Sequence, residues 1–425
     1  MSTDWRSRVL QHVDDHVPEM LAALVDLVRI PTVTGTAVEN EGQAVMARQL
    51  TADGFDIDHW QIDLDAIQAD VDFPGVEVPR DEAWGLVARL PGRGGGRSLM
   101  LNGHIDVVPP GDPAAWSTVD PYSGTVDSGH LYGRGSCDMK AGLVAARWAM
   151  RSLREVGVPL RGDLLLASVQ GEEDGGLGTF STLRRGWRAD ACVIPEPTGL
   201  DLVPANGGAL TFRLHVHGQA THASRRTDGV SALEKLWPVW RALSALEDRR
   251  NREVDPLASR WEIAYPLSIG TVRCGDWPSS VPDLLVAEGR LGVALGEPME
   301  HARQELEQAV AEACDADDWL RAHPVDVEWW GGQFASGRLP EDSDLLELVS
   351  SAHAEASGAG RPDVWAAPYG SDLRLLVGIG GIPTLQYGPG DAARAHGPDE
   401  SVSLAETVTA ARALAVLALD ICGVA

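Results

Sequence analysis

The chain has 425 residues, of which 44% are hydrophobic and 23% charged, and its formal net charge at pH 7 is -27. This composition is that of a globular protein, and the length is too great for one ordinary hydrophobic core, so two domains are expected. So large a negative charge disfavours binding to nucleic acid or to an anionic membrane surface. The function is therefore expected in a pocket for small molecules.

The amino terminus and the cysteines both favour a cytoplasmic protein. The segment MSTDWRSRVLQHVDDH has no apolar run of signal-peptide length, and no later segment offers about 18 uninterrupted apolar residues for a membrane span. The five cysteines are widely spaced and include no C-x-x-C pair, which argues against a disulfide framework and against a thiolate zinc site. We expect a cytoplasmic protein that binds no membrane.

Apolar periodicity in the first half of the chain alternates between helices and buried strands. The predicted elements are a helix over 5–29, strands over 85–90 and 97–102, a helix over 141–156, and strands over 163–170 and 191–194. Such alternation is typical of an α/β domain with a mainly parallel sheet and flanking helices. In sheets of this kind, ligands collect in the loops that leave the carboxyl ends of the strands.

After residue 204 the pattern changes to that of a separate small domain. Strands are predicted over 210–218, 267–272, 284–294 and 325–330, with helices over 229–249 and 299–314. This β-α-β-β-α-β order predicts an α+β unit of ferredoxin-like type, with a four-stranded antiparallel sheet and two helices. The first pattern then resumes with a helix over 343–355, a strand over 382–386 and a helix over 404–421. We therefore predict one domain made of residues 1–203 and 331–425, with residues 204–330 inserted into it.

Five segments rich in His, Asp and Glu carry the chemistry, and each follows an apolar run and is marked by glycine or proline. They are NGHIDVVP with His104 and Asp106, GRGSCDMKAG with Asp138, VQGEEDGG with Glu172 and Glu173, VIPEPTG with Glu196, and YGPGDAARAHGPDE with His396. Neutral imidazole and carboxylate oxygen suit Zn²⁺, so the order and context of these residues predict a site for two metal ions. Taken singly, each could instead be a buried structural histidine or a helix-capping carboxylate.

These motifs, in this order, resemble those of the M20 family of metallopeptidases and amidohydrolases, and the resemblance runs from Ile30 to Glu400. That family includes acetylornithine deacetylase, succinyl-diaminopimelate desuccinylase and glutamate carboxypeptidase. The resemblance implies two zinc ions per chain, with Co²⁺ or Mn²⁺ able to substitute, that share Asp138 as a bridging carboxylate. The remaining ligands that it implies are His104 and Glu196 for one ion, and Glu173 and His396 for the other.

The resemblance also assigns roles beside the ions. Glu172 is the implied general base for the bridging water, and Asp106 the implied carboxylate that accepts a hydrogen bond from the imidazole of His104. Gly171 is expected to break the preceding strand, which allows two adjacent glutamates to serve one site. Asp174, the next residue, is expected to be solvated.

Three further residues are expected to contact the substrate. His222, in GQATHASRR of the inserted domain, matches the family histidine that donates to the developing oxyanion, often at the site of a partner subunit; a surface histidine is the alternative. Arg374 and Arg290 match positions that bind substrate anions, because a guanidinium binds carboxylate bidentately. Either arginine could instead close a surface ion pair. The family often has Asn before Val-Pro where this chain has Ser280, and a Pro after the histidine where it has Ala223, which weakens any transfer of substrate identity.

The resemblance implies a hydrolase that uses two zinc ions to cleave the amide bond of an N-acyl amino acid or related metabolite. A dipeptidase or carboxypeptidase of the same family is the alternative within that chemistry. A binding protein that has kept the fold and lost catalysis is the alternative outside it, although all five implied ligands and Glu172 match the family pattern. We expect a homodimer formed through the inserted lid and dimerisation domain, with a small-molecule substrate and no nucleic-acid partner.

Overall fold

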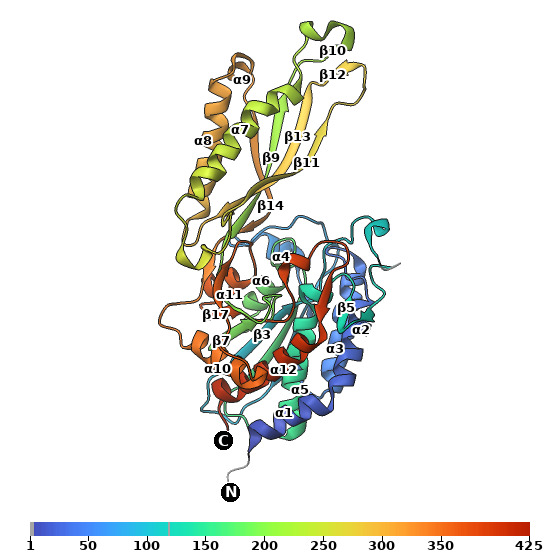
Figure 1. Cartoon of the computed structure of the whole chain (residues 1–425), viewed down its shortest axis with the longest axis vertical. Helices are drawn as coiled ribbons and strands as arrows, with labels where there is room; N and C mark the ends of the chain where they lie inside the picture. Colours follow the sequence, from blue (N-terminus) through green and yellow to red (C-terminus); the bar gives the residue numbers. More distant parts are fainter. Residues whose placement is uncertain (1–3, 118–119) are drawn as a thin grey trace. The chain divides into compact units, whose positions relative to one another are not determined.

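The computed structural model describes residues 4–117 and 120–425, which divide into two units (Figure 1). Unit 2 consists of Asn206–Gly337 and Ala366–Ser371, and the rest of the chain forms unit 1. The second boundary therefore lies beyond the predicted 330/331. The reason is that strand β14 (Asp326–Phe334) continues past a register shift and pairs Gln333 with Leu210.

A nine-stranded mixed sheet runs through unit 1. Its strand order is β1-β2-β6-β3-β7-β17-β8-β15, with β16 paired to β8. Strands β6, β3, β7 and β17 are parallel neighbours, whereas β1, β2 and β8 pair antiparallel, so the predicted mainly parallel α/β sheet is confirmed. The bounds are β1 Asp56–Gln61, β2 Trp84–Leu90, β6 Leu164–Val169, β3 Leu99–His104, β7 Ala191–Ile194, β17 Thr384–Gln386, β8 Leu202–Asn206, β15 Gly337–Arg338 and β16 Val364–Ala367.

Helices cover both faces of the four parallel strands, which explains why these strands are buried along their whole length and mostly apolar. On β6, Leu164 and Leu166 pack with α1, α5, α10 and α12, whereas Leu165 and Ala167 pack with α6 and α11. Successive side chains of a strand point to opposite faces, so a sheet buried on both sides needs a continuous apolar run. Figure 1 shows α12 beside α5 on the first of these faces. The helices of unit 1 are α1 Trp5–Asp15, α2 Val17–Val28, α3 Ala37–Ala52, α4 Leu64–Gln68, α5 Ala141–Val156, α6 Leu177–Arg184, α10 Leu345–Ser357, α11 Leu373–Gly378 and α12 Leu404–Cys422.

The single helix predicted over 5–29 is wrong, because the segment forms two helices, α1 and α2, that meet at His16. Pro18 lies in the first turn of α2. Proline has no N–H to donate and its ring clashes with the carbonyl four residues earlier, so it is favoured at a helix start and disfavoured in a helix interior. No helix within residues 4–117 and 120–425 is both long and apolar enough to cross a membrane.

A small sheet in unit 1 joins two loops that are far apart in the sequence. Strand β18 (Ser401–Ser403) pairs antiparallel with β5 (His130–Tyr132), which in turn pairs with β4 (Thr125–Asp127). The segment that precedes β18 is thereby held beside the segment that follows β5. These are the segments that carry the GPDE and GRGSCDMKAG motifs.

Unit 2 has the predicted four-stranded antiparallel sheet with two helices. Its strand order is β11-β13-β9-β14, and α7 and α8 pack against each other over the sheet (Figure 1). A short pair, β10 with β12, adds a second small sheet that contains His222. The remaining bounds are β9 Gly208–His217, β10 Thr221–His222, α7 Ala232–Arg250, β11 Leu267–Cys274, β12 Ser280–Val281, β13 Leu284–Val293, α8 Met299–Asp315 and α9 Asp318–Ala322.

Candidate metal centre

The carboxyl ends of three neighbouring parallel strands in unit 1 carry the predicted polar residues. His104 is the last residue of β3, the pair Glu172 and Glu173 follows β6, and Glu196 follows β7. Strand β3 lies between β6 and β7, so these loops leave the same edge of the sheet side by side. Gly171 ends β6 with φ +68, as expected for a residue that turns the chain there.

Asp138 and His396 come from the two segments joined by the small sheet. The main-chain N–H groups of Cys137 and Asp138 donate to Oε1 of Glu400 at 3.0 and 3.1 Å. Arg134 donates to the other oxygen of the same carboxylate. Glu400, which is fully buried, therefore fixes the backbone at Asp138 and ties it to the segment that carries His396.

The predicted ligands form two groups that share Asp138. In the first group, Nε2 of His104 lies 3.0 Å from Oδ1 of Asp138 and 3.9 Å from Oε2 of Glu196. In the second, Nε2 of His396 lies 3.4 Å from Oδ2 of Asp138 and 3.2 Å from Oε2 of Glu173. Each group offers three ligand atoms within 4.8 Å of one another. Asp138 thus presents one oxygen to each group, as a carboxylate between two cations would.

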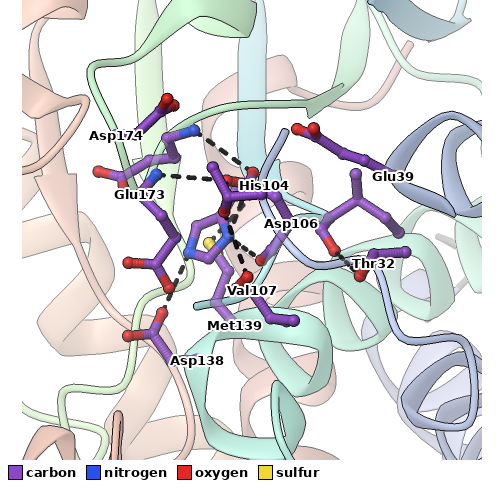
Figure 2. A network of polar contacts seen from close by, with 12 residues as sticks. Thr32, Glu39, His104, Asp106, Val107, Asp138, Met139, Glu173 and Asp174 are labelled. Carbon is purple, nitrogen blue, oxygen red and sulfur yellow. Dashed lines mark hydrogen bonds and ion pairs between the residues drawn. The ribbon is translucent and has the colours of Figure 1, made fainter. Parts of the chain in front are cut away.

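The ring of His104 is oriented for a metal ion. Its Nδ1 lies 2.8 Å from the main-chain oxygen of Asp106, which can only accept, so Nδ1 carries the proton and Nε2 directs its lone pair towards Asp138 (Figure 2). Two acceptors in contact require a proton or a metal ion between them. A ligand histidine whose other nitrogen donates to a carbonyl is the usual arrangement at zinc sites.

A second observation fits a cation at this centre. Oε1 of Glu173 is buried and has no hydrogen-bond partner within the described part of the chain. A buried, unpaired carboxylate oxygen is costly unless a cation compensates it. With two imidazoles and three carboxylates, the donor set suits Zn²⁺, and three protein ligands per group leave a position for water or substrate.

The electrostatics of the two histidines reflect the surrounding carboxylates. Burial opposes the charged form of His104, but Asp138, Glu196 and Asp106 outweigh it and raise the pKa well above its usual range. The charge of Glu173, aided by Asp138 and opposed by burial, raises the pKa of His396 to about 11. Without a metal ion, the centre therefore retains protons in its place.

The pKa values of the carboxyl groups also reflect burial and the neighbouring charges. Burial raises the pKa of Glu172 well above its usual range, and the nearby Asp372 and Glu196 add to the effect. Burial and the charge of Asp138 do the same for Glu196. Burial also opposes the charge of Asp138, but its two imidazole partners hold the pKa of that carboxyl below its usual range.

Asp106 makes different contacts from those expected. The imidazole of His104 donates to its main-chain oxygen, whereas its carboxylate lies 3.8 Å from Nδ1. That carboxylate instead accepts from the main-chain N–H groups of Glu172 and Glu173, both at 3.3 Å, and from the hydroxyl of Thr34 at 3.0 Å. Asp106 therefore orients the ligand ring through its backbone and the glutamate turn through its side chain.

The expectation that Asp174 is solvated is wrong. Its carboxylate is buried and accepts two hydrogen bonds from the guanidinium of Arg80, both at 2.9 Å. It also accepts from the main-chain N–H groups of Glu77 and Val78. Since Arg80 lies far from Asp174 in the sequence, local context gave no sign of this pairing.

A family comparison agrees with the motifs. Residues 100–420 match the model of Peptidase family M20/M25/M40. The chain belongs to this family. The resemblance read from the motifs is thereby confirmed.

The curated relatives of this M20 chain include deacylases that match it over nearly its whole length. An N-formyl-4-amino-5-aminomethyl-2-methylpyrimidine deformylase of Halalkalibacterium halodurans is 29% identical and covers 97% of both chains. The deformylase of the same name from Bacillus subtilis is 27% identical and covers 93% of both. A succinyl-diaminopimelate desuccinylase of Gluconacetobacter diazotrophicus is 32% identical over 90% of this chain and 91% of its own. The chain is a metal-dependent M20 hydrolase of N-acyl amide bonds.

Solved structures share the fold at low sequence identity. A dipeptidase of Saccharomyces cerevisiae superposes with a TM-score of 0.77 at 16% identity and covers 98% of both chains. Human carnosine dipeptidase 1 superposes with a TM-score of 0.74, also at 16% identity and with 98% of both chains covered. These matches support the M20 fold.

The three residues expected to bind substrate are members of neither ligand group. Arg374 is buried; its Nη2 donates to the carbonyl of Gly175 at 2.7 Å, and its Nη1 lies 4.0 Å from Asp372. Arg290, on β13 of unit 2, is exposed, and its guanidinium lies 5.8 Å from the ring of Phe334. His222 is also exposed and belongs to unit 2. Arg374 is thus buried and not part of a surface ion pair, and its contact with a substrate carboxylate stays a prediction.

Several residues that shape the centre were not identified from the sequence. Glu400 and Arg134 lie inside the GPDE and GRG motifs, so their position in those motifs was the available signal. Asp372, close enough to affect the pKa of Glu172, lies inside the segment that was read for Arg374. Arg80 lies outside every motif and could be found only in three dimensions.

Proposed function

We propose that this M20 enzyme is a dinuclear zinc deacylase that removes a formyl group from a small N-formyl amine, of the aminomethylpyrimidine type. The observation that carries the proposal is the full-length similarity to two deformylases of that substrate class, with 97% of both chains covered for the first. The two ligand groups that share Asp138 support the dinuclear centre.

In this proposal His104, Asp138 and Glu196 hold one zinc ion, and Asp138, Glu173 and His396 hold the other. Bound zinc would supply an acidified water and polarise the scissile carbonyl. Glu172 would act as the general base that takes a proton from the attacking water and then as the general acid that gives it to the leaving amine. The turn that carries Glu172 is held by Asp106 from one side, through the main-chain N–H groups of Glu172 and Glu173.

His222 is proposed as the donor to the oxyanion that forms on the carbonyl. The main-chain N–H of Ser224 donates to Nδ1 of His222 at 3.1 Å. An acceptor at Nδ1 leaves the proton of the neutral ring on Nε2. The exposed ring is therefore prepared as a neutral hydrogen-bond donor, the form that an oxyanion contact requires.

We further propose that the enzyme is a homodimer formed through unit 2. Leu233, Trp237 and Trp240 are 54%, 66% and 42% exposed on α7. Their spacing places them on one face of the helix, so they form a continuous apolar stripe. Exposed apolar surface of this kind commonly marks a protein interface. Trp237→Glu should shift the protein from dimer to monomer in analytical ultracentrifugation, and an unchanged dimer would contradict this interface.

The cytoplasm is the proposed location. All five cysteines are free, and Cys137, Cys192, Cys314 and Cys422 are buried. Unpaired cysteines are typical of proteins kept in a reducing compartment.

Hydrolysis of an N-succinyl amino acid is the second candidate, because the desuccinylase is the relative with 32% identity. The contacts of Arg374 make an N-succinyl amino acid the less favoured substrate. A substrate carboxylate would have to compete with the carbonyl of Gly175 and with Asp372 for that guanidinium. The structure therefore favours a substrate whose amine part is neutral.

A hydrolysis screen separates the candidates. N-formyl, N-acetyl and N-succinyl derivatives of an aminomethylpyrimidine and of an amino acid are compared with dipeptides. We expect the N-formyl aminomethylpyrimidine to have the highest kcat/KM. A higher kcat/KM for the N-succinyl amino acid or for a dipeptide would replace the proposed substrate. Zinc bound without hydrolysis of any of them would indicate a binding protein.

A further inference from the structure

A second group of ligand-type side chains lies in unit 1 at the far end of α5. His12 and His16 are one helical turn apart, and their rings stack with centroids 4.1 Å apart and an interplanar angle of 22°. Nε2 of His12 lies 3.0 Å from Oε2 of Glu155, near the last residue of α5. The three residues offer one ligand atom each within 4.8 Å of one another. The candidate metal centre lies before the first residue of α5, and a helix of 16 residues is about 24 Å long.

The hydrogen bonds of His16 fix its tautomer. Its Nδ1 lies 2.8 Å from the main-chain oxygen of His12, so Nδ1 carries the proton and Nε2 has a lone pair. This is the same arrangement as at His104, where the other ring nitrogen donates to a backbone carbonyl. Carbonyl partners of this kind orient ligand histidines at metal sites.

His12 is held by a buried hydroxyl. Its Nδ1 lies 3.0 Å from Oγ of Ser152, which is completely buried. A serine hydroxyl can donate or accept, so Nε2 of His12 either donates to Oε2 of Glu155 or, in the tautomer protonated at Nδ1, directs a lone pair there that a cation can take. Arg151 pairs with the other oxygen of Glu155, at 2.6 Å to Oε1, and so leaves Oε2 to the histidines.

A comparison within the chain shows why this group differs from an ordinary ion-pair cluster. Glu297, His301 and Glu305 also have suitable spacing for a metal ion. There, however, the guanidinium of Arg250 already pairs with both Glu297 and Glu305. An arginine between two carboxylates supplies the positive charge that an ion would bring. No such guanidinium pairs with Oε2 of Glu155 among the ion pairs of the described residues.

We propose that His12, His16 and Glu155 bind one divalent ion of the Zn²⁺, Ni²⁺ or Cu²⁺ class, with the two rings turning out of their stacked arrangement so that both Nε2 atoms face the ion. Two histidines four residues apart on a helix lie on one face and can bind the same ion, and an imidazole and carboxylate set suits these metals. His16 is both the C-cap residue of α1 and the N-cap residue of α2. The ion would join this helix junction to the end of α5 and stabilise the fold, independently of the reaction.

The test uses the enzyme with its catalytic centre filled, so that added metal reports on further sites. Ni²⁺ is titrated by isothermal calorimetry, and zinc retained by the protein is measured in parallel to detect exchange. We expect one further Ni²⁺ per chain and a rise in Tm with Ni²⁺. His16→Ala should weaken that binding by at least about tenfold, since loss of an outer-shell partner alone costs 10- to 100-fold. Deacylation should be unchanged.

A matched control is available in unit 2. His323 also bonds through Nδ1 to a main-chain oxygen one turn earlier, at 3.2 Å to Trp319, and stacks on the Trp319 ring. It has no second imidazole or carboxylate beside it in a candidate metal group of the described residues. His323→Ala should bind Ni²⁺ as the unmodified enzyme does. Glu155→Gln, which changes an exposed side chain, checks the result without altering either helix.

Three results would overturn the proposal. They are no Ni²⁺ binding beyond the filled catalytic centre, unchanged binding in both His16→Ala and Glu155→Gln, and zinc displaced from the catalytic centre in proportion to the Ni²⁺ taken up. The first two results would leave the proposed deacylase activity untouched, whereas the third would be accompanied by a change in activity as nickel replaces zinc.

Discussion

The candidate metal centre of unit 1 and the sheet of unit 2 differ in how far their charged side chains are buried. At the centre, His104, Asp106 and Glu196 are at least 95% buried. On β9 of unit 2, Arg213 pairs with Glu288 and Glu328 where one or both partners are in contact with solvent. Exposed ion pairs contribute about 0 to 1 kcal/mol, whereas each buried charge costs several kcal/mol unless it is compensated.

This difference indicates which clusters of charge need a ligand. The pairs on β9 satisfy each other, and nothing further is required there. At the centre the carboxylates outnumber the cationic groups, and Oε1 of Glu173 remains without a partner among the described residues. Buried negative charge that the protein itself leaves uncompensated is therefore what distinguishes the candidate metal centre from the surface ion pairs.

Removal of the metal should have the largest effect. Chelation should abolish hydrolysis, because the acidified water is lost, and should lower Tm, because buried carboxylates lose their counter-charge. Zinc analysis before and after dialysis, with activity restored by added Zn²⁺, measures both. Full activity in a protein with less than one metal ion per chain would remove the metal centre from the mechanism.

The two adjacent glutamates offer the next test. Glu172→Gln should keep its metal and lower kcat by about 10²- to 10⁴-fold, the usual scale of general acid-base catalysis. Glu173→Gln should lose metal affinity, since Oε2 of Glu173 lies 3.2 Å from the ligand nitrogen of His396. The metal content and the kcat of both variants are measured. Equal metal loss in the two would show that the roles are misassigned.

The central strands and helices could be predicted from the sequence because burial on both faces leaves an unbroken apolar run. Helix α5 and strand β7 begin and end where the pattern predicted. The edge strands were missed because they are short or half exposed: β15 has two residues, and β1 alternates between exposed and partly buried positions.

The five candidate ligands that the structure brings together could be selected from the sequence because each lies in a motif, but the residues that hold them in place could not. Asp174 pairs with Arg80, and Asp106 accepts from Thr34, across separations of 94 and 72 residues. Nothing in the local sequence specifies such partners. The same limit applies to Arg374, whose neighbours follow from the packing of the turn at Gly175.

His222 tests whether unit 2 contributes to catalysis at all. Removal of one oxyanion donor typically costs about 10²- to 10³-fold in kcat, and we expect His222→Ala to fall in that range with metal content unchanged. His217→Ala is the control, because that ring pairs with Asp326 on an exposed part of the same unit. An unchanged kcat for His222→Ala would leave the chemistry entirely to unit 1.

Glu400 offers the finest test, because it acts on the metal only through the backbone. Its carboxylate accepts from the N–H groups of Cys137 and Asp138, so Glu400→Gln keeps the shape and one acceptor oxygen but removes the charge opposite Arg134. We expect metal affinity to fall by about 10- to 100-fold, as for other partners that orient a ligand. Glu406→Gln is the matched control, since Glu406 accepts from the main-chain N–H of Gly390 and has no hydrogen bond to the Asp138 segment within the described residues. A titration with Co²⁺ can follow both affinity and the magnetic coupling that a shared carboxylate gives two ions. If Glu400→Gln lowers Tm but leaves affinity and coupling unchanged, Glu400 supports the fold alone, and the position of Asp138 is set by the ions themselves.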